Sequence, residues 1–143
     1  MAGETTSLAA GAWTEVKTVP GARLGGVLHV YSQTATYSAT NQLELNDVME
    51  VGYLPAGITI YGVAVTATDM DTNGSPLLTQ KVTVGSTDVV TGITDGRSAA
   101  TTYYPAPTPY TTTDTELVKI TNTAAAATAA TGSLKLRWYY TTA

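Results

Sequence analysis

Hydrophobic and polar residues alternate along most of the chain after residue 20. The clearest alternation runs over Ile58–Ala67, where both faces carry apolar groups, and this predicts a central β-strand. A second clear alternation covers residues 133–140, in which one face is apolar and the other is cationic or aromatic. The apolar face holds Leu134, Leu136, Trp138 and Tyr140, and the other face holds Lys135, Arg137 and Tyr139.

Further strands are predicted from shorter alternating runs bounded by Gly, Pro, Asn and Asp. They cover residues 23–31 (continued after a bend by 34–37), 47–54, 77–84, 88–90 and 116–121. The alanine-rich stretch 124–130 is too short for an isolated helix and is predicted to be a loop. Six to eight short strands without a convincing helix predict an all-β fold. We expect a single β-sandwich or jelly-roll-like domain over residues 20–143.

Two segments depart from the alternating pattern. Residues 1–19 show no sustained period and carry one large side chain, Trp13, which predicts an extended N-terminal arm. Residues 98–113 are rich in Thr, Tyr and Pro, with prolines at positions 105, 107 and 109. Proline at every second position is incompatible with helix or central strand, so an extended, polyproline-like loop is expected there. Trp13 and three tyrosines are the predicted interface residues, with sugar stacking as the alternative role: Tyr103, Tyr104 and Tyr110.

Composition narrows the possible functions. The length of 143 residues fits one domain, and only 13% of the residues are charged. The net charge of −4 argues against a nucleic-acid partner, which calls for a basic face. The absence of cysteine excludes thiol catalysis and cysteine-based metal sites. No apolar run is long enough to span a membrane, and no secretory signal is visible.

The segment from Asp69 to Gly74 resembles half of a calcium-binding loop. Asp69, Asp71 and Asn73 have the D-x-D-x-N spacing, followed by glycine. The twelfth position is Gln80, which cannot supply a bidentate carboxylate, and no helices flank the loop. We therefore expect no metal and a hairpin turn built on Asn73-Gly74, with a calcium site at these three residues as the alternative.

Catalysis is not expected. The chain has one histidine, His29, and no nucleophile or metalloprotease motif accompanies it. No cofactor is expected either. A hydrolase that depends on His29 is the remaining enzymatic alternative.

Three segments resemble the small head proteins of tailed bacteriophages that are encoded beside the major capsid protein. They are Asn46-Asp-Val-Met-Glu-Val-Gly-Tyr-Leu-Pro-Ala-Gly-Ile58, Thr113-Asp-Thr-Glu-Leu-Val118 and Gly132-Ser-Leu-Lys-Leu-Arg-Trp-Tyr139. The resemblance implies a capsid cement or decoration protein, made in the host cytoplasm and seated on the exterior of the virion. It further implies a homotrimer that binds the major capsid protein and has no catalytic residues. A carbohydrate- or receptor-binding module of a phage fibre or tail is the alternative function.

Overall fold

The computed structural model describes residues 27–142, which confirm the predicted all-β class. It contains eight strands and one short 3-10 turn, η3 (Asp95–Arg97). The strands are β1 (His29–Tyr37), β2 (Val48–Leu54), β3 (Ile58–Ala67), β4 (Thr79–Val84), β5 (Thr87–Ile93), β6 (Thr101–Thr111), β7 (Glu116–Ala124) and β8 (Gly132–Thr142). Residues 29–140 form one compact unit. The predicted arm 1–19, Trp13 and residues 20–26 lie outside the described residues.

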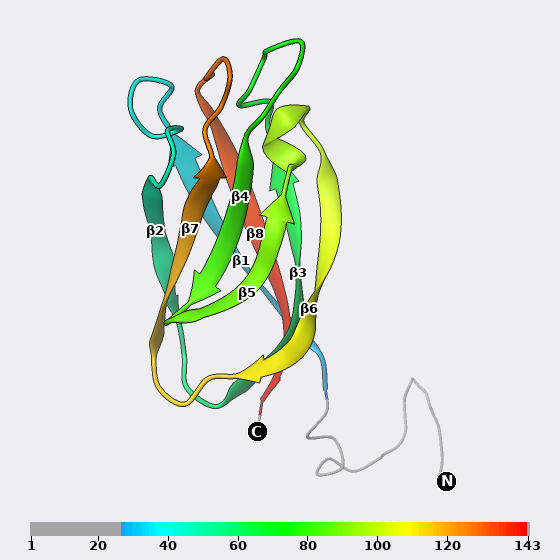
Figure 1. Cartoon of the computed structure of the whole chain (residues 1–143). Coiled ribbons are helices and arrows are strands. Elements are labelled where there is room, and N and C mark those ends of the chain that lie inside the picture. The colour runs from blue at the N-terminus through cyan, green and yellow to red at the C-terminus, as the bar shows by residue number, and fades with distance from the viewer. Residues whose placement is uncertain (1–26, 143) are drawn as a thin grey trace, which may run out of the picture. The chain divides into compact units, whose positions relative to one another are not determined.

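The strands form two four-stranded antiparallel sheets that make a β-sandwich (Figure 1). One sheet has the order β1-β8-β3-β6 and the other the order β2-β7-β4-β5. Every consecutive pair of strands except β4 and β5 changes sheet, so the connections cross the two ends of the sandwich. The long connections 38–47, 68–78, 94–100 and 125–131 share one end, which we call the loop end. The short connections 55–57, 85–86 and 112–115 share the opposite end, the turn end.

The core lies between the sheets and is built from the alternate residues of each strand that face inward. In β8 these residues are Leu134, Leu136 and Trp138, as the sequence pattern predicts, and all three are fully buried. Burial of such side chains stabilises the fold by about 1.5–3 kcal/mol each. The Trp138 indole N–H donates to Gln33 Oε1 at 2.9 Å, and Gln33 Nε2 donates to the Tyr53 carbonyl at 3.3 Å. Gln33 thus connects β1 and β8 to β2 of the other sheet.

Residues 98–113 do not form the expected loop, because β6 spans most of them. β6 is an edge strand, and a strand edge is where proline is compatible with a sheet, since no N–H is needed on the open side. Its pairing with β3 also shifts register between Ile60 and Gly62. Ile60 pairs with Tyr110 and Gly62 with Pro105, so residues 106–109 form a large bulge. We call residues 105–109 the proline bulge.

The expected hairpin at Asn73-Gly74 is also wrong. Residues 68–78 connect β3 to β4, and these two strands lie in different sheets. The connection itself contains no strand, only one bridge between Asp71 and Ala129. A hairpin requires adjacent strands of one sheet. The connection that does form a hairpin is Gly85-Ser86, between β4 and β5.

Candidate interaction surfaces

The carboxylate of Asp71 is the centre of the loop end. It is buried and accepts four backbone N–H bonds of 2.7–3.0 Å, two from Leu77 and Leu78 and two from Ala127 and Thr128. These donors belong to two different long connections, so one side chain fixes the β3–β4 connection against the β7–β8 connection. Burial alone would raise the pKa of Asp71, but the four N–H groups hold it well below its usual range.

The oxygens of the three candidate calcium ligands already accept backbone hydrogen bonds: Asp71 holds the two long connections together, and Asp69 and Asn73 bond within their own loop. Asp69 Oδ1 accepts the Asp71 N–H at 3.2 Å, and Asn73 Oδ1 accepts the Ser75 N–H at 2.8 Å. Within residues 27–142 no group of three or more His, Cys, Asp or Glu side chains is placed to hold a metal ion. The arrangement supports a loop staple in which backbone N–H groups surround the Asp71 carboxylate.

Two of the predicted interface tyrosines make internal hydrogen bonds. The half-buried Tyr104 faces the core, and its hydroxyl donates to the buried carboxylate of Asp95. Burial and then the bond to Asp95 raise the pKa of Tyr104. The Tyr110 hydroxyl donates to Glu116 Oε1 at 2.5 Å, and this bond raises the pKa of Tyr110. Each bond fixes one end of β6 to a neighbouring connection or strand.

Tyr103 lies on the outer face of the sheet and is 50% exposed. Its ring crosses Gly62, where a Cβ atom would lie 2.2 Å from the tyrosine hydroxyl oxygen. It meets Tyr139 edge-to-face at a centroid distance of 5.5 Å. Tyr139 pairs across strands with the exposed Val30. We call this outer surface the tyrosine face and define it by Val30, Tyr103, Lys135, Arg137 and Tyr139.

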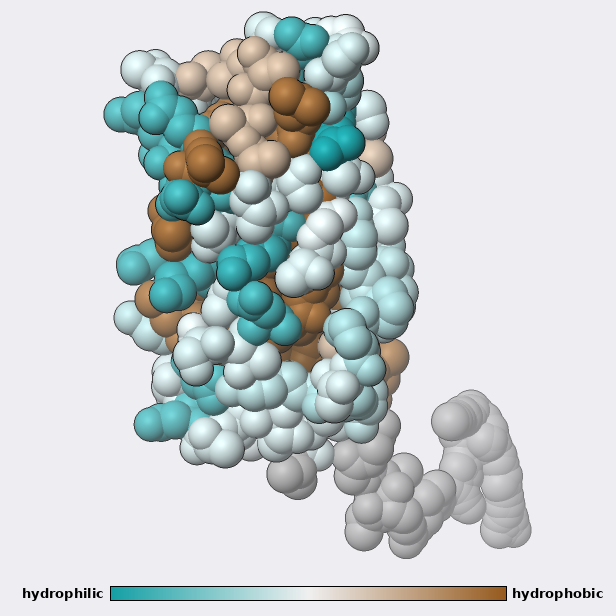
Figure 2. Space-filling model, in the orientation of Figure 1, coloured by the Kyte–Doolittle hydropathy of each residue, from teal (hydrophilic) through white to brown (hydrophobic). Residues whose placement is uncertain are grey.

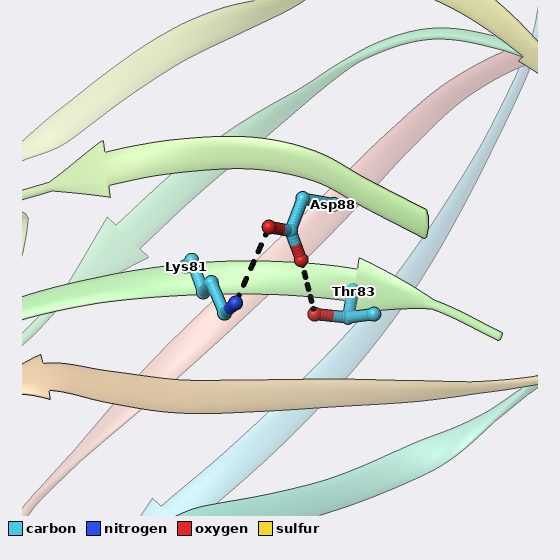
Figure 3. A network of polar contacts seen from close by, with 3 residues as sticks. All are labelled: Lys81, Thr83 and Asp88. Atoms are coloured by element: carbon cyan, nitrogen blue, oxygen red, sulfur yellow. Dashed lines mark hydrogen bonds and ion pairs between the residues drawn. The ribbon is translucent and has the colours of Figure 1, made fainter. Parts of the chain in front are cut away.

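The two sheets differ in charge. The strands of the sheet that carries the tyrosine face contain no Asp or Glu, and Lys135 and Arg137 are exposed there. The opposite sheet carries both signs, and hydrophilic, intermediate and hydrophobic residues are interspersed over its outer surface (Figure 2). Within residues 27–142 the one ion pair, Lys81 with Asp88 at 3.2 Å, is on that sheet (Figure 3). The tyrosine face is therefore the more suitable surface for an acidic or neutral partner.

A tyrosine-lined hollow of about 200 Å³ opens at the turn end. We call it the tyrosine hollow, and its lining residues are Tyr31, Tyr53, Leu54, Pro55, Ile58 and Tyr140. Tyr53 is 63% exposed and Tyr31 is 48% exposed. The sequence does not predict this site, because its three tyrosines come from three separate strands. The only local signal is Tyr53, two residues before Pro55 at the end of β2.

His29 is exposed and stacks on Tyr140 at a centroid distance of 5.5 Å. Within residues 27–142 no hydrogen bond or ion pair of its side chain accompanies this stacking. The position supports a packing role at the margin of the tyrosine hollow.

No helix in the described part of the chain is long and apolar enough to cross a membrane.

Comparison with known proteins gives two related folds from phage capsids. No family model and no curated protein matches the chain. A chain of the cyanophage Pam1 capsid asymmetric unit has a TM-score of 0.71 and 25% identity, and covers 96% of this chain and 100% of its own length. A chain of the Ralstonia phage GP4 capsid has a TM-score of 0.69 and 18% identity over 82% of this chain and 86% of its own. The likeness to the GP4 chain shows a shared fold only. Together, the two likenesses support the assignment of this chain as a phage capsid structural protein.

Proposed function

We propose that this protein is a non-enzymatic cement protein that binds the exterior of a phage capsid and stabilises the shell. The observation that carries the proposal is the likeness to a whole chain of the Pam1 capsid asymmetric unit, since 96% of this chain matches 100% of that one. The expected partners are the major capsid protein and two further copies of this chain in a homotrimer.

The strand order supports the same proposal. Sheets ordered β1-β8-β3-β6 and β2-β7-β4-β5, with chain crossings at both ends, correspond to the eight-stranded jelly roll. Double-sheet jelly rolls occur in viral capsid and lectin domains, among others. The fold alone therefore leaves a glycan-binding role open, and the capsid likeness favours the structural one.

The tyrosine face is the proposed contact with the shell. Two packed tyrosines bury a large area at low cost in side-chain entropy. Lys135 and Arg137 supply positive charge on a sheet whose strands have no carboxylate to oppose it. Many identical contacts on one shell act together, so a modest affinity for each copy is sufficient.

The first test is whether the protein copurifies with intact virions, and in how many copies per particle. The second is rebinding of purified protein to particles from which it has been removed. Reversing both cations of the tyrosine face, Lys135→Glu with Arg137→Glu, should reduce occupancy by about tenfold or more. The matched control, Lys81→Glu with Lys119→Glu, makes the same change of net charge on the opposite sheet and should reduce occupancy far less.

Two outcomes would overturn the proposal. Absence of the protein from virions would remove the capsid role altogether. Equal loss of occupancy in the two double variants would remove the assignment of the tyrosine face, because the effect would then follow net charge alone.

A further inference from the structure

The tyrosine hollow and the proline bulge are chemically complementary surfaces. The hollow presents three tyrosine rings and a proline around about 200 Å³ of open space, and its lining residues carry no formal charge. Grooves lined by aromatic residues bind extended proline-rich segments, because such segments are already rigid and lose little entropy on docking. A proline-rich segment, the proline bulge, is exposed on the surface of the same protein.

The proline bulge is exposed, and its prolines and a hydrogen bond at its end restrict its conformation. Pro105, Pro107 and Pro109 are exposed, while the intervening Ala106 packs against the core. The proline rings fix the backbone φ angle near −65°. The bond between Tyr110 and Glu116 fixes the point where the bulge returns to the sheet. The bulge also carries no charged residue.

The two surfaces lie on opposite sides of the sandwich at nearly the same level. The hollow lies on the side where β1 and β2 are neighbours, and the bulge lies on the side where β5 and β6 are neighbours. Ile58 lines the hollow, and the bulge ends at the residue paired with Ile60 of the same strand. Two residues of a strand correspond to about 7 Å, so the levels differ little.

We propose that the proline bulge of one copy docks in the tyrosine hollow of the next copy, which joins copies head to tail. A head-to-tail contact between two different patches closes into a ring when the rotation between copies involves no translation. The hollow and the bulge lie at nearly the same height along the strands. A rotation about an axis parallel to the strands therefore brings the bulge of one copy to the hollow of the next with little translation. Each copy carries a net charge of −4, and contact through the uncharged hollow and bulge is little opposed by repulsion, because Asp88 beside the bulge is paired with Lys81.

A disulfide test uses the full chain, which has no native cysteine. Tyr53→Cys with Pro107→Cys places one thiol at the hollow and one on the bulge. Oxidation should give a covalent ladder that ends at one closed ring. The matched control is Leu77→Cys with Pro107→Cys, because Leu77 is 58% exposed but lies at the loop end. Either single variant should give dimers at most.

Sedimentation analysis gives the second readout. Tyr53→Ser and Pro107→Ala should each weaken association of the purified protein by about tenfold, as expected for the loss of an anchor residue. Leu77→Ala should change it less than twofold. Both tested residues are exposed, so far-ultraviolet circular dichroism should show an unchanged fold.

The inference does not rest on binding to a capsid. Purified protein that stays monomeric and forms no ladder, both free and on particles, overturns the ring and leaves capsid binding unaffected. Equal cross-linking in the control pair also overturns it. A specific ladder in a protein that is absent from virions would support the ring and contradict the proposed function.

Discussion

The two ends of the sandwich differ in the length of their connections and in the number of buried polar groups that those connections contain. At the loop end, four long connections carry many polar groups into the structure, and buried side chains such as Asp71 and Asn122 bond to several of them. At the turn end the connections are short, few polar groups need partners, and tyrosines and prolines stay exposed. The difference indicates that buried polar groups contribute more to stability at the loop end than at the turn end.

A polar network under the loop end illustrates the first part. Asn122 is fully buried, and its side-chain amide donates to the carbonyls of Gln42 and Glu44 at 3.0 Å. Its Oδ1 accepts from Gln80 Nε2 at 3.0 Å, and Gln80 Nε2 also lies 3.3 Å from the Tyr37 hydroxyl. Burial raises the pKa of Tyr37, which keeps it neutral. The bonds of this network favour one arrangement of the connections, although the buried Gln80 Oε1 has no hydrogen-bond partner among the described residues.

Asp71→Asn is the substitution with the largest expected effect. The new amide group would direct N–H donors at backbone N–H groups that now bond to a carboxylate. We expect the free energy of unfolding to fall by about 3 kcal/mol in chemical denaturation. Asp69→Asn is the control, because Asp69 is exposed, and it should cost less than about 1 kcal/mol. Similar losses in both variants would remove Asp71 from the centre of the loop end.

Acid should weaken the loop end through the same carboxylate. The pKa of Asp71 is lower in the folded protein than the value of about 3.9 in an unfolded chain. Its contribution to stability is therefore complete above about pH 4 and is lost as the pH falls below that value. Between about pH 4 and pH 2, Asp71→Asn should make the slope of unfolding free energy against pH shallower by up to about 1.4 kcal/mol per pH unit. Parallel slopes for the two proteins would contradict this assignment.

Tyr103 and Tyr104 are adjacent in the chain, but Tyr103 is exposed and Tyr104 is half-buried. Replacing each by phenylalanine compares the contributions of the two hydroxyls to stability. Tyr104→Phe removes the hydroxyl that donates to the buried carboxylate of Asp95 and should cost about 1–3 kcal/mol. Tyr103→Phe should change stability by less than about 0.5 kcal/mol, because its ring lies on the surface. Thermal unfolding of both variants measures the difference. A larger loss from Tyr103→Phe would mean that the tyrosine face is structural.

The sequence predicted best what depends on local pattern. The predicted strand Ile58–Ala67 has the same bounds as β3, and the place of β3 between β8 and β6 confirms that this strand is central. The role of Asp71 could not be predicted, because two of its partners, Ala127 and Thr128, are more than 50 residues away in the chain. The prolines of β6 predict a loop from sequence because alternation alone does not reveal which strand lies at an edge.

The turn end should respond least to loss of a carboxylate. Asp88, beside the β4–β5 turn, accepts from Lys81 Nζ and from Thr83 Oγ1, each at 3.2 Å (Figure 3). Both charged partners are partly exposed, so solvent screens the ion pair. Asp88→Asn should therefore lower the free energy of unfolding by about 0.2–1 kcal/mol, and less at high salt. The contrast between the two ends rests on the buried carboxylate of Asp71, with four backbone donors within 3.0 Å, contributing more than the exposed carboxylate of Asp88, with two side-chain donors. If Asp88→Asn costs as much as Asp71→Asn in the same denaturation series, that contrast is wrong.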